Sequence, residues 1–163
     1  MRALLIFGLG YTATRIARAM AGQGWQVRAT GRAGDIAFAD RSAVLAALAE
    51  ASHVLSSVPP DRASGADPVL AAYGESLAGK ALFYLSSTGV YGDRQGAWVD
   101  EATPTISEEG EGRRNARAEA DLAWLGRGAR VFRLPGIYGP GRSALDRVRA
   151  GAARRIALPG QGN

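Results

Sequence analysis

The sequence predicts an α/β fold in which a doubly wound parallel sheet lies between two layers of helices. The chain opens on a short apolar run, residues 3–7, that ends at a glycine, as strands buried on both faces of a sheet do. Helical spacing follows, and a second strand-like run ends near residue 30. Strand and helix patterns then alternate along the chain, which is the arrangement that produces a parallel sheet covered on both faces.

The first strand, helix and second strand form a βαβ unit over residues 3–30. Apolar residues recur at helical spacing between residues 13 and 20, and glycines at 22 and 24 are expected to end this helix. Residues 25–30 are expected to form the second strand.

The later elements follow the same alternation in shorter form. We expect helices at 41–50, 68–78, 115–125 and 143–150, and strands at 53–57, 81–86 and 130–134. Residues 87–110, rich in Gly, Thr, Asp and Glu, are expected to form a long loop. Because only about ten residues separate the second strand from the next helix, one strand–helix crossover is expected to be shortened or missing.

Composition excludes several classes of protein. With 163 residues the chain fits one domain, expected over residues 1–163, and is too short for two ordinary ones. Cysteine is absent and His53 is the single histidine, so we expect no disulfide scaffold, no metal site and no cysteine nucleophile. The lack of cysteine fits a cytoplasmic protein. No apolar run approaches the roughly 20 residues of a membrane helix.

The net charge of +5 could attract nucleic acid or a phosphorylated small molecule. The densest basic stretch, residues 142–155, contains no aromatic residue between its arginines. We therefore interpret it as a solvated helix face and do not expect nucleic acid as a partner. A homodimer stays an open alternative.

A glycine-rich turn between the first strand and helix is the strongest local signal. Residues 8–13 read Gly-Leu-Gly-Tyr-Thr-Ala, which matches the dinucleotide fingerprint G-x-G-x-x-G/A. Gly8 permits the tight turn, Gly10 lets the backbone approach a diphosphate, and Ala13 allows close strand–helix packing. The helix start offers free N–H groups to phosphates. The predicted cofactor-binding residues in this turn are Gly8, Leu9, Gly10, Tyr11, Thr12 and Ala13.

The end of the second strand indicates which dinucleotide is bound. An NAD site usually places Asp or Glu there to bind the ribose 2′-OH. This chain has Thr30, Gly31 and Arg32, and no acid before Asp35. A guanidinium at Arg32 suits a 2′-phosphate, so we expect NADP to be preferred and NAD to be the alternative.

Two further motifs complete a resemblance to a known family. Residues 85–93 read Leu-Ser-Ser-Thr-Gly-Val-Tyr-Gly-Asp, and residues 133–141 read Arg-Leu-Pro-Gly-Ile-Tyr-Gly-Pro-Gly. With the fingerprint, they resemble the extended short-chain dehydrogenases, the NAD-dependent epimerase/dehydratase group, over essentially the whole chain. The resemblance implies a Rossmann fold with three αβα layers. It also implies a nicotinamide cofactor and a substrate such as a nucleotide-linked sugar.

The resemblance also implies roles for individual residues. Ser87 occupies the position of the catalytic Ser/Thr that hydrogen-bonds the reacting hydroxyl or carbonyl, and Thr88 could share that task. Asp40 resembles the acid that contacts the adenine amino group. The other implied cofactor contacts are Ser57 and Val58 beside the ribose, and Pro135, Gly136 and Ile137 near the nicotinamide.

The helix after the Ser87 motif departs from the family. Family members place Tyr and Lys four residues apart there, followed by Glu four residues later. Aligned on Glu119, this chain has Glu111 in the tyrosine position and Asn115 in the lysine position. The chain is therefore identified as an atypical member that lacks the Tyr-x-x-x-Lys pair.

Three explanations of this departure stay open. Glu111 could serve as a different base, although an unperturbed carboxylate with a pKa of about 4.3 is a weak one. Tyr91 or Tyr138 could supply a hydroxyl from another direction. Otherwise the protein binds cofactor as a sensor or regulator without proton transfer. We favour an enzyme, because the Ser87 and Tyr138 loops are intact.

The end of the chain bears on the substrate. Residues 158–163 read Leu-Pro-Gly-Gln-Gly-Asn, a motif that in the family precedes most of a smaller C-terminal substrate lobe. We therefore expect this lobe to be largely absent or truncated. Whether the protein is a minimal version or the sequence is a fragment stays open, and most of the residues that would choose the substrate are expected to lie in that lobe.

Overall fold

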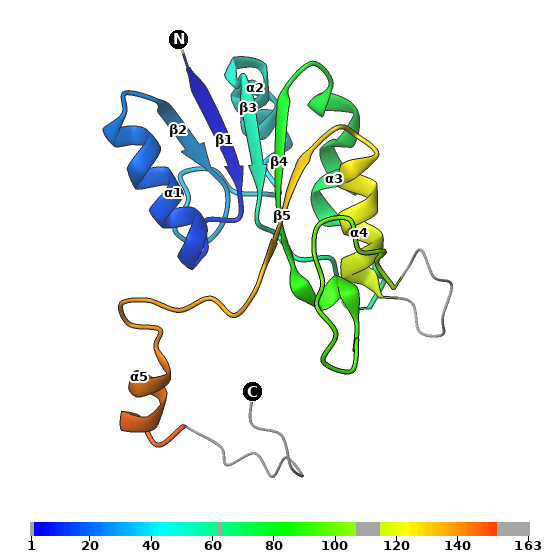
Figure 1. Cartoon of the computed structure of the whole chain (residues 1–163). Helices are drawn as coiled ribbons and strands as arrows, with labels where there is room; N and C mark the ends of the chain where they lie inside the picture. The colour runs from blue at the N-terminus through cyan, green and yellow to red at the C-terminus, as the bar shows by residue number, and fades with distance from the viewer. Residues whose placement is uncertain (1, 62, 107–114, 153–163) are drawn as a thin grey trace.

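A computed structural model of the chain describes residues 2–61, 63–106 and 115–152, and its strands form one parallel sheet. The strands are β1 (Ala3–Phe7), β2 (Gln26–Ala29), β3 (His53–Ser56), β4 (Ala81–Ser87) and β5 (Arg130–Leu134). Their order across the sheet is β2-β1-β3-β4-β5, and each neighbouring pair is parallel. Figure 1 shows this sheet.

The described α-helices are α1 (Tyr11–Gly22), α2 (Arg41–Glu50), α3 (Pro68–Tyr73), α4 (Ala116–Leu125) and α5 (Ala144–Arg149). Four of these five, α1 to α4, cover the two faces of the sheet, whereas α5 lies beyond its carboxyl edge (Figure 1), so the predicted doubly wound fold is confirmed. The chain runs outward from β1 through α1 to the edge strand β2, and then returns through α2 to β3. Because parallel crossovers are right-handed, this reversal of direction places α1 on one face and α2, α3 and α4 on the other.

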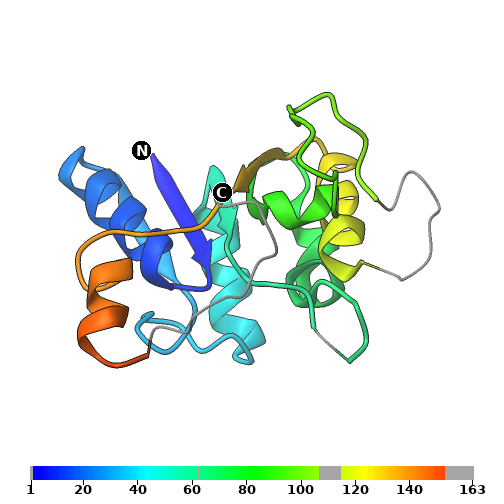
Figure 2. The ribbon, with the colours of Figure 1, turned by 60° about the horizontal axis from the view of Figure 1, so that its bottom comes forward.

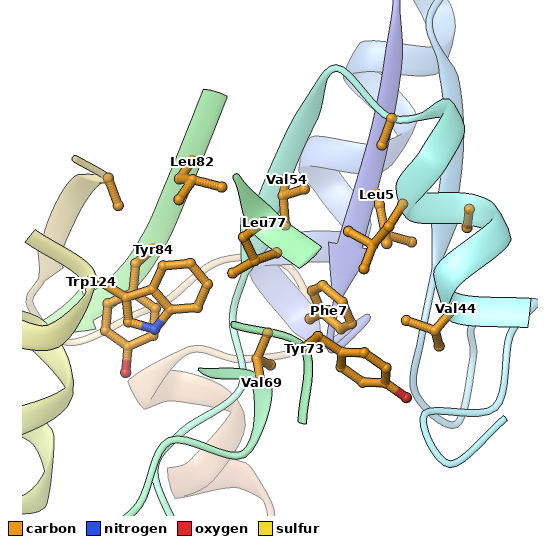
Figure 3. Close-up of a cluster of buried hydrophobic side chains, with 14 of the residues drawn as sticks. Leu5, Phe7, Val44, Val54, Val69, Tyr73, Leu77, Leu82, Tyr84 and Trp124 are labelled. Atoms are coloured by element: carbon orange, nitrogen blue, oxygen red, sulfur yellow. The ribbon is translucent and has the colours of Figure 1, made fainter. Parts of the chain in front are cut away.

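Alternate residues of β1 enter two apolar cores. Leu5 and Phe7 belong to the core beneath α2, α3 and α4, which Figure 3 shows in close-up. Leu4 and Ile6 belong to the core beneath α1. All of β1 is buried, as its continuous apolar run predicts. Trp124 of α4 is fully buried in the larger core, where its indole N–H donates to Asp67 at 2.8 Å.

Some elements differ from the predicted ones at their ends. The helix expected over residues 68–78 is split into α3 and the short 3₁₀ helix η1 (Gly74–Leu77), since Gly74 is a poor helix former at the junction. The loop expected from residue 87 begins with the 3₁₀ helix η2 (Thr88–Tyr91). Its start is fixed by the Ser87 side chain, which accepts a hydrogen bond from the Gly89 N–H at 3.2 Å.

The expected loss of one crossover is visible at the edge of the sheet. Within the described residues no further strand lies outside β2; residues 30–40 lead from it to α2, with a single parallel bridge between Thr30 and Ile36. The strand order reverses between β1 and β3, because the chain runs outward from β1 to β2 and then returns to the other side of β1. Ligands of open α/β sheets bind at such a reversal, outside the carboxyl ends of the strands. This edge is at the bottom of Figure 1 and comes forward in Figure 2.

Among the described residues, no helix has both the length and the apolar character needed to span a membrane.

Candidate cofactor site at the carboxyl edge of the sheet

The first turn of α1 has no side-chain cap. Gly10 precedes this helix in an extended conformation, and no side chain accepts a hydrogen bond from its first amides. The other described α-helices are each capped by a side chain, namely Asp40, Asp67, Asn115 and Ser143. Unpaired N–H groups and the helix dipole make such a start attractive to an anion. The fingerprint residues therefore form the one described α-helix start that is left open.

The two glycines of the turn have different surroundings. Gly8 has φ +85°, a conformation that favours glycine, and a Cβ atom there would lie 3.0 Å from both Ser57 Oγ and Val58 Cγ2. At Gly10, by contrast, a Cβ atom would meet nothing within 4 Å. Gly8 is thus required by the fold, whereas the space over Gly10 is free for a ligand.

Three hydrogen bonds hold the turn against its neighbouring strands. The Thr30 carbonyl accepts from the Leu9 N–H at 2.9 Å, and Thr30 Oγ1 accepts from the Gly8 N–H at 3.2 Å. Ser57 Oγ donates to the Gly8 carbonyl at 2.5 Å. Thr30 belongs to no motif, so its buried position behind the turn could not be inferred from the sequence. Because the turn is braced on both sides, its amides are pre-organised.

A cavity of about 450 Å³ opens beside this turn. Its walls come from the start of α1, the ends of β4 and β5, and the first turn of α4. The lining residues that the sequence had singled out are Gly10, Tyr11, Thr12, Ala13, Ser57, Ser87, Thr88, Pro135, Gly136 and Ile137. The lining residues with no predicted role are Leu85, Ser86, Arg117, Leu134 and Arg142. The structure therefore brings most of the predicted site residues together in one place.

Two of the unpredicted residues are cations, and no carboxylate lies among the described residues of the cavity wall. Arg117 is in the first turn of α4, and its Nη1 donates to the Tyr84 hydroxyl at 3.3 Å. The Arg142 guanidinium carbon lies 5.5 Å from the centroid of the Tyr11 ring. Arg117 lies two residues after the helix cap Asn115. This position in the first turn of a helix was the only sequence signal that could have placed Arg117 at the carboxyl edge of the sheet.

Ser86 is a further polar group of the wall. Its side-chain oxygen is buried and has no hydrogen-bond partner among the described residues. A buried hydroxyl without a partner costs about 1–3 kcal/mol. Ligands that bring a hydrogen-bonding group to this wall would recover part of that cost.

Ser87 and Thr88 line the cavity, whereas Asn115, which the sequence resemblance assigns to the lysine position, precedes α4 and is not among the lining residues. Asn115 Oδ1 accepts from the N–H groups of Arg117 and Ala118, both at 3.1 Å, and so caps α4. Its Nδ2 donates to the Gly89 carbonyl at 3.4 Å. Asn115 therefore ties the start of α4 to the segment that carries Ser87. A side-chain amide is neutral and does not act as an acid or a base near neutral pH.

Tyr91 lies outside the walls of this cavity. Its ring is buried, and its hydroxyl donates to the Asp100 carbonyl at 2.7 Å and accepts from Arg133 Nη1 at 3.0 Å. Arg133 in turn forms an ion pair with the buried Asp121 at 2.9 Å. The hydroxyl of Tyr91 is thus engaged in holding the 91–101 segment to β5.

Two of the residues named as sources of a base or hydroxyl remain, Glu111 and Tyr138. Glu111 lies outside the described residues. Tyr138 is 84% exposed and does not line the cavity. The catalytic roles of Ser87, Thr88, Glu111 and Tyr91 all stay predictions.

Arg32 and Asp35 lie beyond the glycine turn at the end of β2. Arg32 is exposed and follows Gly31, where a Cβ atom would lie 3.0 Å from the Leu9 nitrogen. The Asp35 carboxylate is bound by the Arg28 guanidinium and by the Ala29 N–H, the latter at 2.7 Å. Burial opposes ionisation of Asp35, but these two hydrogen bonds outweigh it and hold the pKa below its usual value.

Asp40, the predicted adenine contact, caps α2. Its Oδ1 accepts from the Ala43 N–H at 3.0 Å and from the Ser42 hydroxyl at 2.7 Å. These two hydrogen bonds lower the pKa of Asp40. The contact with adenine stays a prediction.

The fold and the open helix start define a class of protein. A parallel sheet with a strand-order reversal and a glycine turn before an uncapped helix is the architecture of Rossmann-type dinucleotide-binding folds. Solved structures with this arrangement include members of the short-chain dehydrogenase/reductase superfamily. The resemblance predicted from the sequence is therefore confirmed for the fold.

Comparison with known proteins identifies the individual relatives. No family model matches the chain. The chain is 30% identical to the Escherichia coli K12 protein YeeZ over 168 residues, which covers 87% of this chain and 61% of that protein. It is 39% identical to a conserved protein of unknown function from Silicibacter pomeroyi, with a TM-score of 0.76. This match covers 99% of the present chain and 62% of the Silicibacter protein. The chain thus spans about three fifths of the length of these relatives.

Two structures with bound cofactor show the same fold at lower identity. The enzyme WbmH of Bordetella bronchiseptica, in complex with NAD⁺, is 16% identical with a TM-score of 0.62, and the match covers 93% of this chain and 63% of WbmH. A short-chain dehydrogenase/reductase superfamily protein from Agrobacterium tumefaciens, with bound NAD, is 19% identical with a TM-score of 0.53 and coverage of 81% and 48%.

Proposed function

We propose that the chain is a nicotinamide dinucleotide-binding domain whose ligand lies at the carboxyl edge of the sheet. The observation that carries this proposal is the start of α1, which is uncapped and faces free space over Gly10. The cavity beside it has Arg142 next to Tyr11 at this helix start and, among its described lining residues, no carboxylate. An anionic cofactor suits this charge. The WbmH and Agrobacterium structures, which contain NAD, add support from the fold.

The residues of the cavity fit such a cofactor. The amides of residues 11–13 would hold the diphosphate, and Ser57 and Val58 border the same turn. Residues 135–137 also line the cavity, and the family resemblance implies the nicotinamide beside them. When bound, the cofactor supplies a hydride donor or acceptor.

We further propose that NADP is preferred to NAD. Arg32 stands exposed beside the glycine turn, where its charge is available to a 2′-phosphate. Asp35, the nearest acid after β2, is already bound by Arg28 and by the Ala29 N–H. A carboxylate held in this way is a poor acceptor for the ribose 2′-OH of NAD.

For the reaction, we propose an oxidoreductase or an epimerase/dehydratase that acts on a hydroxyl or carbonyl group, with a nucleotide-linked sugar as the expected substrate. Ser87 and Thr88 line the cavity and can hydrogen-bond the reacting oxygen. Glu111 is the proposed base. We place this activity in the cytoplasm, because a chain without cysteine fits a reducing compartment.

A second candidate is a regulatory protein that binds NADP(H) without catalysis. Asn115 favours it, because the side chain in the lysine position caps α4 and carries no charge. The Tyr91 hydroxyl is bonded elsewhere, so it does not replace the missing tyrosine in this arrangement.

The test is fluorescence titration with NADPH and NADH, followed by turnover assays with UDP-glucose and UDP-N-acetylglucosamine. We expect both dinucleotides to bind, NADPH more tightly. If neither NADPH nor NADH binds, both the enzyme and the regulatory protein are excluded. Binding without turnover or isotope exchange on any substrate would favour the regulator. Unaltered turnover in Glu111→Gln would remove Glu111 as the base.

A further inference from the structure

The two cations of the cavity enter it from opposite faces of the sheet. Arg142 lies beside Tyr11 at the start of α1, where the dinucleotide diphosphate is proposed to bind. Arg117 extends from α4, which covers the other face, and contacts Tyr84 of β4. The charge of Arg117 is therefore separate from the open amides of α1, and the diphosphate does not account for it.

The described surroundings of Arg117 do not neutralise it. Its one hydrogen-bond partner among the described side chains is the Tyr84 hydroxyl, and burial raises the pKa of Tyr84 to about 12, so that this phenol stays uncharged. The neighbouring carboxylates are engaged elsewhere: Asp121 pairs with Arg133, and Asp67 accepts from Trp124. A guanidinium has five N–H donors, so several of those of Arg117 are left for a ligand.

Arg117 is also held in place relative to the predicted reacting groups. Its backbone N–H donates to Asn115 Oδ1, and Asn115 Nδ2 donates to the Gly89 carbonyl, two residues after Ser87. Asn115 thus links the start of α4 to the segment that follows Ser87. Ser86, on the same wall, adds a buried hydroxyl without a partner in the described structure.

We propose that Arg117 binds an anionic group, a carboxylate or a phosphate, of the second ligand that shares this cavity with the dinucleotide. This inference rests on the proposed function and narrows its substrate class. The substrate would be a hydroxy or keto compound that carries its negative charge near the carbon held by Ser87 and Thr88. Arginine suits this role, because its planar fork matches carboxylate and phosphate oxygens in pairs.

The experiment uses the full chain saturated with NADPH, so that the α1 start is filled before the second ligand is added. Inorganic phosphate, lactate and propane-1,2-diol are titrated separately, and binding is followed by two-dimensional ¹H–¹⁵N NMR, including the arginine side-chain signals. The diol matches lactate in size and lacks its charge. We expect both anions to bind and the diol to bind at least tenfold more weakly.

Two substitutions separate the role of Arg117 from general charge effects. Arg117→Gln is expected to weaken phosphate and lactate binding at least tenfold, while the NADPH dissociation constant changes less than twofold. Arg117→Lys keeps the charge without the fork and is expected to bind the anions with intermediate affinity. The matched control is Arg18→Gln on the exposed face of α1, which removes the same charge away from the cavity and is expected to change neither. Thermal unfolding checks each variant, and Arg117→Lys serves if Arg117→Gln does not fold.

The outcomes distinguish this inference from the proposed function. Unchanged anion affinity in Arg117→Gln overturns the inference. A loss of NADPH affinity as large as the loss of anion affinity also overturns it, because it would assign Arg117 to the cofactor. Failure of the NADPH-saturated wild type to bind either anion also overturns it. If the wild type does not bind NADPH, the proposed function is lost. Phosphate titration of the free protein, comparing Arg117→Gln with Arg18→Gln, then still decides whether Arg117 holds an anion.

Discussion

Gly10→Val tests the role of the α1 start directly, because the substitution fills the space over the helix without disturbing its neighbours. Gly10 has φ −83°, which valine tolerates, and a Cβ atom there meets nothing within 4 Å. The folded protein should therefore accept the side chain. Loss of glycine from the helix start costs about 1 kcal/mol, which lowers Tm by about 2–4 °C in a protein of this size.

The effect on binding is expected to be much larger. The branched side chain would keep a diphosphate from the amides of residues 11–13. Losing two charge-assisted hydrogen bonds, at about 1.5–3 kcal/mol each, costs about 3–6 kcal/mol, or at least about 100-fold in the NADPH dissociation constant. The measurement is titration of NADPH fluorescence on the folded variant.

The control is Gly22→Val, which places the same side chain in open space at the other end of α1. We expect this variant to bind NADPH as the wild type does. If Gly10→Val keeps its fold and binds NADPH within threefold of the wild type, the diphosphate does not lie on these amides, and the assignment of the site is wrong.

Three further predictions follow from the geometry. Arg32→Asp is expected to lower the ratio of NADPH to NADH affinity by at least about tenfold, since it replaces a charge-assisted partner with a repulsive one; an unchanged ratio in paired titrations would contradict the NADP preference. Asp121→Asn leaves Arg133 largely buried without its ion pair and is expected to cost about 3–5 kcal/mol, measured by urea unfolding; a loss below 1 kcal/mol would contradict the structural role of this pair. Asp40→Ala is expected to destabilise the protein at neutral pH. The pKa of Asp40 is lowered in the folded protein. The difference in free energy of unfolding between the wild type and the variant is therefore largest above the usual aspartate pKa of about 3.8, and it disappears as the pH falls through the folded pKa. If urea titrations at pH 2 show the same stability difference between the wild type and Asp40→Ala as at neutral pH, the charge of Asp40 does not contribute to stability.

The parts of the fold that could be predicted from the sequence are those with local causes. The apolar run of β1 and the glycine turn that follows it are each encoded within a few neighbouring residues. The predicted position of Ser87 at the end of β4 follows in the same way, because a buried strand that stops at polar residues places them at the edge of the sheet.

The contacts that decide the chemistry are long-range and could not be predicted in this way. The Tyr91 hydroxyl is bonded by Arg133, 42 positions later, so a residue that looks available in the sequence is engaged in the fold. Likewise, Thr30 supports the Gly8 turn only because β2 pairs with β1. Sequence spacing contains no record of such pairings, since they depend on strand order and on which helix covers which face.

The start of α4 carries both the predicted departure from the Tyr-x-x-x-Lys pattern and a nearby cation. Asn115, which the sequence resemblance assigns to the lysine position, is uncharged, caps the helix and donates to the Gly89 carbonyl. Arg117 restores a charge two residues later, which is about 200° further around a helix of 3.6 residues per turn. This cation lines the cavity and contacts Tyr84. We predict that a guanidinium in this place binds an anion and does not activate a hydroxyl in the tyrosine position. The same substitutions that remove the family's proton-transfer pair would thus change the kind of ligand that the cavity prefers.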